Sequence, residues 1–350
     1  MSEHKSEASQ VLYRKYRPQS FKEVLGQEAV VEALEGAIKL GNISHAYLFA
    51  GSRGTGKTSV ARIFAKAIGT SPNDLYEMDA ASNNGVDEVR LLNEGVRTLP
   101  FESKYKVYIL DEAHMLSKSA FNAFLKTLEE PPAHVVFILA TTEFEKIPET
   151  VLSRCQSFTF RKPSQKILKE VVERIAKKEG FSIDAPSAEL IALLSEGSFR
   201  DAQGMLQRVI ASSEDTKISI AEVERATGSP KGSLINEVIV AIHEKSAAKG
   251  LGAVSKAVEQ NIDMKIFAML LLAKLRFILL LRNAPEMASV IKSEVSTEDF
   301  SFLKTEAART GSAINSSVLL EFLTSYDLIG FAEIPELSLE LSIIKLCGGA

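Results

Sequence analysis

One short segment has the residue types and spacing of a phosphate-binding loop. It is Gly51-Ser-Arg-Gly-Thr-Gly-Lys57-Thr58, which has the form GxxxxGKT. Glycines let backbone amides wrap around an anion, and the N-terminus of the next helix adds positive partial charge. The alternative is a glycine-rich turn that binds nothing, which the apolar run before the segment disfavours. The expected ATP-binding residues of this loop are Gly51, Ser52, Arg53, Gly54, Thr55, Gly56, Lys57 and Thr58.

Two acidic residues follow a second apolar run, in Val107-Tyr-Ile-Leu-Asp111-Glu112. We expect Lys57 to reach the β- and γ-phosphates of ATP, and Thr58 and Asp111 to hold Mg²⁺. Glu112 would then activate the attacking water as a general base. An acidic loop after a strand is weak evidence by itself. It gains weight here because we expect the two motifs to end neighbouring parallel strands at one edge of a sheet.

Three further polar residues near these motifs have open roles. A hydroxyl of Thr141 or Thr142, at the end of the next apolar run, could orient water or contact the γ-phosphate, or could bond within its own turn. His114 could act in catalysis, but a packing or helix-capping role is equally compatible with the sequence.

Apolar segments alternate with helical patterns in the first half of the chain, which predicts a parallel sheet covered by helices. The expected strands are Ala46–Ala50, Asp74–Asp79, Lys106–Leu110, Val135–Thr141 and Ser157–Arg161. The expected helices among them include Lys57–Ile68, Val86–Arg97 and Ser117–Leu128.

From Pro163 onward the pattern is helical. Three expected helices, Ser164–Glu179, Pro186–Ser195 and Arg200–Ser212, predict a small bundle. The segment Gly228-Ser-Pro-Lys-Gly-Ser233 predicts a linker, and only helical periodicity follows it. The predicted domains are therefore a nucleotide-binding core at 1–162, a three-helix domain at 163–228 and a further helical domain at 229–350.

Composition and charge limit the class of protein. The 350 residues suit two or three domains, and the net charge of −4 disfavours strong autonomous binding to nucleic acid. Cys155 and Cys347 are the only cysteines and form no CxxC pair, which favours a reducing, cytoplasmic location. The first ten residues, MSEHKSEASQ, lack the apolar core of a secretory signal. Basic residues interrupt the apolar stretch Met264–Leu281, which therefore predicts a buried helix rather than a membrane span.

Longer phrases around these motifs resemble one family, the gamma/tau subunits of the bacterial DNA polymerase III clamp loader. The phrases are Tyr13-Arg-Lys-Tyr-Arg-Pro18, Val24-Leu-Gly-Gln27, Ser44-His-Ala-Tyr-Leu-Phe49, Asp79-Ala-Ala-Ser-Asn-Asn-Gly85, Phe121-Asn-Ala-Phe-Leu-Lys-Thr-Leu-Glu-Glu-Pro-Pro132, Ser153-Arg154-Cys155 and Glu196-Gly-Ser-Phe-Arg200-Asp201. They lie within residues 11–228, whereas residues 229–350 match only as a helical segment of suitable length. The resemblance implies an α/β AAA+ P-loop domain with a parallel sheet, then a small helical lid and an all-α collar.

The resemblance also implies roles for single residues. Arg154 would be an arginine finger that reaches the ATP of a neighbouring subunit, and Arg200 the sensor-2 arginine. Thr142, with Thr141 as a close alternative, matches the sensor-1 position. Without the resemblance, Arg154 would be interpreted as a surface salt-bridge partner and Arg200 as an ordinary residue at a helix start. The residues that resemble the adenine pocket are Tyr13, Pro18, Val24 and Leu25.

The sequence departs from the family after the phosphate-loop helix. Most gamma/tau subunits carry a four-cysteine zinc module there, whereas this chain has only Gly69-Thr-Ser-Pro-Asn-Asp74. Structural zinc sites need Cys or His ligands, so we expect ATP and Mg²⁺ as cofactors but no zinc.

The function that the resemblance implies is ATP-driven loading of a sliding clamp onto primed DNA, within the DNA-directed DNA polymerase III holoenzyme. Expected partners are delta and delta-prime subunits, further copies of this chain, the clamp and primer-template DNA, with no membrane. Helix N-termini and basic side chains would contact backbone phosphates. Arg90 and Lys118 are candidates for this contact, although each could also lie on a solvated helix face. The apolar residues of Leu99-Pro-Phe101 could contact the clamp or close the core.

Three other functions share part of the pattern: a replication factor C small subunit, a non-catalytic scaffold like delta-prime, and a Holliday-junction helicase motor. The phrases Asp79–Gly85 and Leu128–Pro132 favour the bacterial clamp-loader family over the first. The intact pair of motifs argues against a scaffold. The combination of Ser-Arg154-Cys with Gly-Ser-Phe-Arg200-Asp-Ala disfavours the helicase motor.

Overall fold

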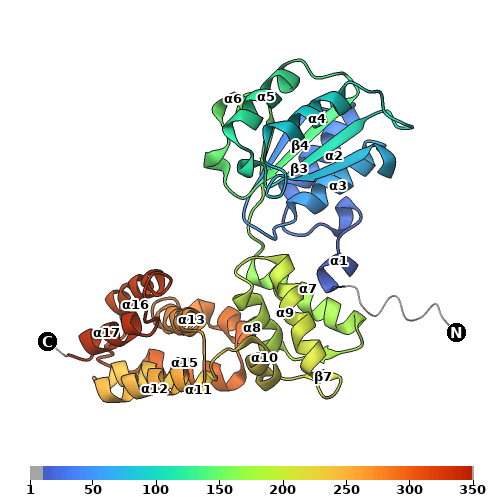
Figure 1. Cartoon of the computed structure of the whole chain (residues 1–350). Helices are drawn as coiled ribbons and strands as arrows, with labels where there is room; N and C mark the ends of the chain where they lie inside the picture. The colour runs from blue at the N-terminus through green and yellow to red at the C-terminus, as the bar shows by residue number, and fades with distance from the viewer. Residues whose placement is uncertain (1–10, 349–350) are drawn as a thin grey trace. The chain divides into compact units, whose positions relative to one another are not determined.

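The computed structural model describes residues 11–348, so the polar N-terminal decapeptide and the last two residues lie outside the described part. The chain divides into two compact units (Figure 1). Unit 1 comprises Met1–Leu168 and Ser195–Gly204, and unit 2 comprises Lys169–Leu194 and Met205–Ala350. The limits of the three domains expected from the sequence stay a prediction.

A five-stranded parallel sheet with the order β2-β3-β4-β1-β5 forms the centre of unit 1. Each predicted strand is present, with small shifts at its ends. The strands are β1 (Ala46–Ala50), β2 (Leu75–Asp79), β3 (Lys106–Asp111), β4 (Val135–Thr141) and β5 (Gln156–Thr159). The central strands β1 and β4 are buried along their whole length, which explains their nearly continuous apolar sequences.

One expectation about the sheet is wrong. The strand before the phosphate loop, β1, and the strand before the acidic pair, β3, are not neighbours, because β4 lies between them and pairs with both. The order of strands along a chain does not fix their order in a parallel sheet, since crossover helices allow several arrangements. The observed order places the end of β4, and with it Thr141 and Thr142, between the two motifs.

Helices cover both faces of this sheet (Figure 1). On one face, β-strand residues such as Phe49 and Ile138 pack with Leu34 and Phe64 from α2 and α3. On the other face, strand residues including Leu139 pack with residues of α4, α5 and α6. The helices of unit 1 are α1 (Leu12–Lys15), α2 (Glu28–Leu40), α3 (Lys57–Ala67), α4 (Val86–Val96), α5 (Lys118–Glu129) and α6 (Glu149–Leu152). Short 3-10 helices lie between them: η2 (Phe21–Glu23), η3 (Pro72–Asp74), η4 (Ala113–Met115) and η5 (Phe144–Lys146).

Unit 2 is almost entirely helical, as predicted. Two helices, α7 (Gln165–Lys178) and α9 (Phe199–Ser212), belong partly to each unit. A fourth helix before the expected linker, α10, and a short parallel bridge between β6 (Ser182–Ile183) and β7 (Lys217–Ile218) were not predicted. The expected linker is short, because α11 already begins at Gly232. The other helices are α8 (Ala185–Leu194), α10 (Ile220–Thr227), α11 (Gly232–His243), α12 (Ala247–Glu259), α13 (Met264–Asn283), η6 (Pro285–Met287), α14 (Ala288–Glu294), α15 (Thr297–Ala308), α16 (Ser316–Ile329) and α17 (Leu337–Leu346).

The apolar stretch at Met264–Leu281 forms α13, a buried helix, as the sequence predicts. Two of the basic residues of α13 are bonded within the protein: Lys274 Nζ donates to Asp299 Oδ1 at 2.5 Å, and the guanidinium of Arg282 donates to the carbonyl of Ile314 at 2.6 Å. Among the residues that the structure describes, no helix combines the length and apolarity needed to cross a membrane.

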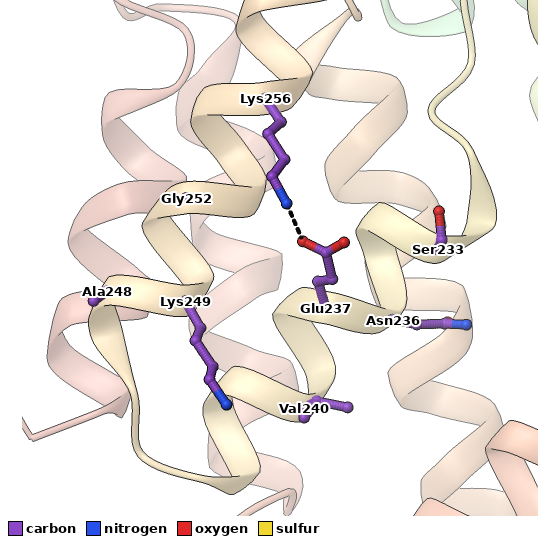
Figure 2. Close-up of a pocket in the computed structure, with 8 residues that line it drawn as sticks. All are labelled: Ser233, Asn236, Glu237, Val240, Ala248, Lys249, Gly252 and Lys256. Atoms are coloured by element: carbon purple, nitrogen blue, oxygen red, sulfur yellow. Dashed lines mark hydrogen bonds and ion pairs between the residues drawn. The ribbon is translucent and has the colours of Figure 1, made fainter.

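A shallow groove runs between α11 and α12 (Figure 2). Val240, Ala248 and Gly252 line it, and the ion pair of Glu237 with Lys256, at 2.9 Å, spans it. None of the residues assigned from the sequence to ATP binding or catalysis lines this groove.

Candidate nucleotide-binding site

The phosphate loop connects β1 to α3 and depends on its glycines. Gly51, Gly54 and Gly56 all have positive φ, of 153°, 75° and 103°. A Cβ atom on Gly51 would lie 2.4 Å from the carbonyl oxygen of Phe160, and one on Gly54 would lie 2.0 Å from Ser198 Oγ. No other residue type could therefore take these two positions without displacing its surroundings.

Lys57 is the first residue of α3 and is 5% exposed. Its Nζ donates to the carbonyls of Gly51 at 2.6 Å and Ser52 at 3.0 Å, so the ammonium lies inside the loop. Burial lowers the pKa of Lys57, while the carboxylates of Glu112 and Asp111 act in the opposite direction. A cation with reduced hydration at this position favours an anion in the same loop.

Thr58, on α3, contacts Asp111, the last residue of β3, although β1 and β3 are not adjacent. The Thr58 hydroxyl donates to Asp111 Oδ2 at 2.8 Å. A hydroxyl and a carboxylate are the hard oxygen ligands that Mg²⁺ prefers. These residues therefore fit a magnesium ion bound together with nucleotide phosphates.

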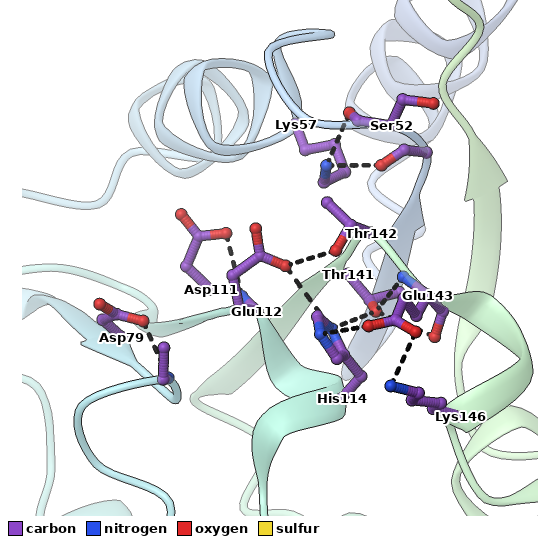
Figure 3. Close-up of polar contacts among 12 residues, drawn as sticks. Ser52, Lys57, Asp79, Asp111, Glu112, His114, Thr141, Thr142, Glu143 and Lys146 are labelled. Carbon is purple, nitrogen blue, oxygen red and sulfur yellow. Dashed lines mark hydrogen bonds and ion pairs between the residues drawn. The ribbon is translucent and has the colours of Figure 1, made fainter. Parts of the chain in front are cut away.

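The carboxylate of Glu112 lies at the end of β3, close to the end of β4 (Figure 3). Its Oε2 accepts a hydrogen bond from the Thr142 hydroxyl at 2.9 Å. The Thr141 hydroxyl instead bonds within its own turn, where it accepts from the backbone N–H of Glu143 at 3.0 Å. Of the two threonines considered from the sequence, Thr142 is thus the one in contact with the expected general base.

The residues expected at the adenine pocket come from the N-terminal part of unit 1. Tyr13 lies on α1, Pro18 precedes η2, and Val24 and Leu25 follow it, and all four are partly exposed. The Arg200 guanidinium lies 5.4 Å from the centre of the Tyr13 ring, a cation–π distance. Arg200 stands at the start of α9, one residue after Phe199, whose N–H donates to the Gly54 carbonyl at 3.0 Å. The structure therefore brings the expected sensor-2 arginine next to the phosphate loop and to Tyr13.

Comparison with known proteins shows which proteins this chain is similar to. The tau subunit of DNA polymerase III from Bacillus subtilis is 36% identical over 363 aligned residues, which cover 97% of this chain and 63% of that protein. The tau subunit from Escherichia coli is 37% identical over 79% of this chain and 46% of its own length. Over most of its length the chain is therefore similar to the gamma/tau subunits of DNA polymerase III. A family model described as DNA polymerase III, delta subunit also matches residues 26–83 and 70–164.

The chain spans less than two thirds of the length of these gamma/tau relatives. Among solved structures, the Holliday junction branch migration motor RuvB of Thermotoga maritima is similar with a TM-score of 0.53. The match covers 85% of this chain and 93% of RuvB at 21% identity. That likeness shows the fold alone, an α/β domain with a parallel sheet followed by a helical C-terminal region.

Arg154 lies apart from the phosphate loop. It follows α6, and its guanidinium donates to Glu129 Oε1, at the end of α5, and to the carbonyl of Thr150, each at 2.6 Å. Burial raises the pKa of the neighbouring Cys155 thiol to about 12, so this cysteine is a neutral, packed side chain rather than a reactive thiolate.

The two DNA-contact candidates lie near adjoining helix N-termini. Lys118 is the exposed first residue of α5, and Arg90 is exposed on α4, where it pairs with Asp87 at 2.9 Å. The N–H of Ser117, which caps α5, donates to the carbonyl of Asn84 at 3.0 Å, just before α4 begins. The starts of the two helices are therefore side by side.

Two residues that hold the phosphate loop were missing from the residues expected to form the site. Gln27 is 4% exposed, and its Nε2 donates to the carbonyls of Arg161 at 2.7 Å and Thr55 at 3.4 Å. Ser198 contacts Gly54, as described above. Gln27 and Ser198 each lie within a phrase that resembles the family, which was the available indication for both.

Proposed function

We propose that this chain is an ATP-driven clamp loader subunit that opens a sliding clamp and loads it on primed DNA in the bacterial cytoplasm. The observation that carries the proposal is the convergence of Lys57, Thr58, Asp111 and Glu112 at one edge of the sheet, in a chain similar to the gamma/tau subunits. ATP and Mg²⁺ would be the cofactors, and hydrolysis would use the water that Glu112 activates.

The position of Arg154 supports a role as an arginine finger in trans. The phosphate loop follows the carboxyl end of β1, whereas Arg154 precedes Gln156, which pairs with Tyr47 near the amino end of β1. The four residues of β5 span about 13 Å. Arg154 therefore lies where the strands begin, and the phosphate loop lies where they end. An arginine so placed is suited to the triphosphate of an adjacent subunit, where it would stabilise charge on the transferring phosphoryl group.

The adjoining starts of α4 and α5 support a role in DNA binding. The N-terminal amides of a helix and its dipole attract phosphate, and Lys118 adds a cation at the same place. Arg90 is partly neutralised by Asp87, so we expect a smaller contribution from it. Contacts of this kind would recognise the DNA backbone without reading its sequence.

The loop after α4 has the properties of a surface that binds the clamp. Leu99 is 77% exposed and Phe101 is 81% exposed, so neither closes the core. The buried carboxylate of Asp74 fixes the loop by accepting the N–H groups of Phe101, Glu102 and Ser103. Exposed apolar side chains on an ordered loop suit an apolar depression in a protein partner.

Reconstitution tests the proposed function. The purified chain would be mixed with delta, delta-prime and clamp proteins, and the mass of the complex measured with and without an ATP analogue. We expect a complex that contains the clamp only when the analogue is present, and a weaker one when Leu99 and Phe101 are both replaced by serine. The proposal would be contradicted if clamp binding were the same with and without the ATP analogue and were also unchanged by the two serine replacements.

A further inference from the structure

His114 connects the carboxylate of Glu112 to the turn that follows β4 (Figure 3). Its side chain is only 6% exposed. The ring Nε2 lies 3.1 Å from Glu143 Oε1, and Nδ1 lies 3.0 Å from the Thr141 hydroxyl and 3.5 Å from Glu112 Oε2. One imidazole therefore contacts side chains from both strands that end at the site.

The charges around His114 define which ring nitrogen carries a proton. A hydrogen bond from Lys146 lowers the pKa of Glu143 below its ordinary value; desolvation opposes this shift, and the charges of Lys146 and His114 add to it. An ionised carboxylate can only accept, so Nε2–H donates to Glu143. This bond fixes the ring orientation and directs Nδ1 toward Thr141 and Glu112. Because the Glu112 carboxylate also only accepts, His114 holds it as an imidazolium, in which Nδ1 carries a proton as well.

Glu112 has a conformation that needs such support. Its φ of 48° and ψ of 46° are left-handed, a region that non-glycine residues rarely adopt. Only its Oε2 has partners, Thr142 and His114, among the hydrogen bonds and ion pairs of the described residues. Its second oxygen is left to act on water, and a general base works only when held within hydrogen-bond reach of its substrate.

We propose that His114 is a positioning residue, which Glu143 anchors and which, together with Thr142, holds the Glu112 carboxylate in its working orientation. This inference rests on the proposed ATPase function. His114 itself would not contact the nucleotide, so its loss should slow turnover without weakening nucleotide binding.

The test is the steady-state ATPase of the reconstituted, DNA-stimulated loader, with kcat and KM measured separately. We expect His114→Ala and Glu143→Ala each to lower kcat about tenfold, less than the loss of about 10²–10⁴ for removal of a general base. We expect KM for ATP to stay within about twofold of wild type. Glu145→Ala is the matched control, because it removes an equal charge from an exposed position of the same turn, and should leave kcat unchanged.

The variant that combines His114→Ala and Glu143→Ala tests whether the two residues affect kcat through one shared interaction or independently. If Glu143 acts through His114, the double variant is no slower than His114→Ala alone. The proposal would be overturned if the loss of kcat in the double variant equalled the product of the two single losses. It would also be overturned if His114→Ala had the kcat of the wild type. If His114→Ala fails to fold, Glu143→Ala decides the outcome alone, since Glu143 lies near the surface. The proposed function would fail separately, by normal turnover in Glu112→Gln.

Discussion

At the scale of single residues, the nucleotide site and the loop that follows α4 each depend on a charge that the fold keeps from water. Lys57 is enclosed by carbonyls of its own loop, and Asp74, farther along the chain, is fully buried among backbone N–H groups. Such groups are costly when their partners are absent, because neither water nor another side chain replaces the lost interactions. Substitution at either position should therefore have a large and specific effect.

Lys57→Ala should weaken ATP binding, because it removes one charge-assisted hydrogen bond to ATP. Each such hydrogen bond contributes about 1.5–3 kcal/mol, so we expect affinity for ATP to fall at least about tenfold. Isothermal titration with a non-hydrolysable ATP analogue would measure it. Lys66→Ala, at an exposed position of the same helix α3, is the control and should bind normally. Unchanged affinity in Lys57→Ala would refute the assignment of the site.

Asp74→Asn should destabilise the loop that displays Leu99 and Phe101. Burial alone would raise the pKa of Asp74, but the N–H groups of Glu102, Phe101 and Ser103 lower it from 3.8 to about 2. The folded pKa is below the unfolded value, so the stabilisation is present above pH 3.8 and is lost as the pH falls toward 2.

We expect the asparagine variant to lose about 1–3 kcal/mol of unfolding free energy near neutral pH. The difference from wild type should shrink as the pH falls through this range, and urea titrations at several pH values would measure it. A difference that stays constant with pH would show that the Asp74 charge is not involved.

The sequence predicted those site residues whose motif is local. Lys57 and Thr58 occupy one loop, and Asp111 and Glu112 one strand end, so their spacing alone indicated their chemistry. The contact of Gln27 with Arg161 spans 134 residues, and the contact of Ser198 with Gly54 joins α9 to the phosphate loop. Such contacts exist only after the elements assemble, and for that reason sequence patterns missed them.

At the scale of elements, the types of helices and strands were predictable and their arrangement was not. The inner strands β1, β3 and β4 could be recognised as short apolar runs, because both faces of these strands are buried. The insertion of β4 between β1 and β3 could not be recognised. It matters for the site, since it brings Thr142 to Glu112.

Gly54→Ala tests the close approach of the phosphate loop to the start of α9. A side chain there would have φ of +75° and would collide with Ser198, so we expect a loss of about 1–3 kcal/mol in unfolding free energy and weaker ATP binding. Gly36→Ala is the control, because Gly36 lies within α2 with open space around its Cβ position. It should be neutral or stabilising by up to about 1 kcal/mol. Equal behaviour of the two variants in thermal unfolding would refute this account of the loop.

At the scale of the whole molecule, the proposed function gives each subunit the parts of two half-sites. The phosphate loop and the acidic pair lie at one edge of the sheet of unit 1, and Arg154 lies toward the other edge, held by Glu129. In the proposed assembly, ATP would be cleaved only where the loop of one subunit meets the arginine of the next. The net charge of −4 is consistent with a protein that contacts DNA through a local surface.

The most direct test of this composite site is complementation between two inactive variants. Loaders would be reconstituted with Lys57→Ala alone, Arg154→Ala alone, or an equal mixture, and their DNA-stimulated ATPase measured. Arg174→Ala, an exposed arginine on α7, would serve as the control with normal activity. Loss of an arginine finger lowers turnover by about 10³–10⁵, so each variant alone should be inactive. The mixture should regain activity, because an intact loop in one subunit can face an intact Arg154 in the next. An inactive mixture, or full activity of Arg154→Ala alone, would contradict the account.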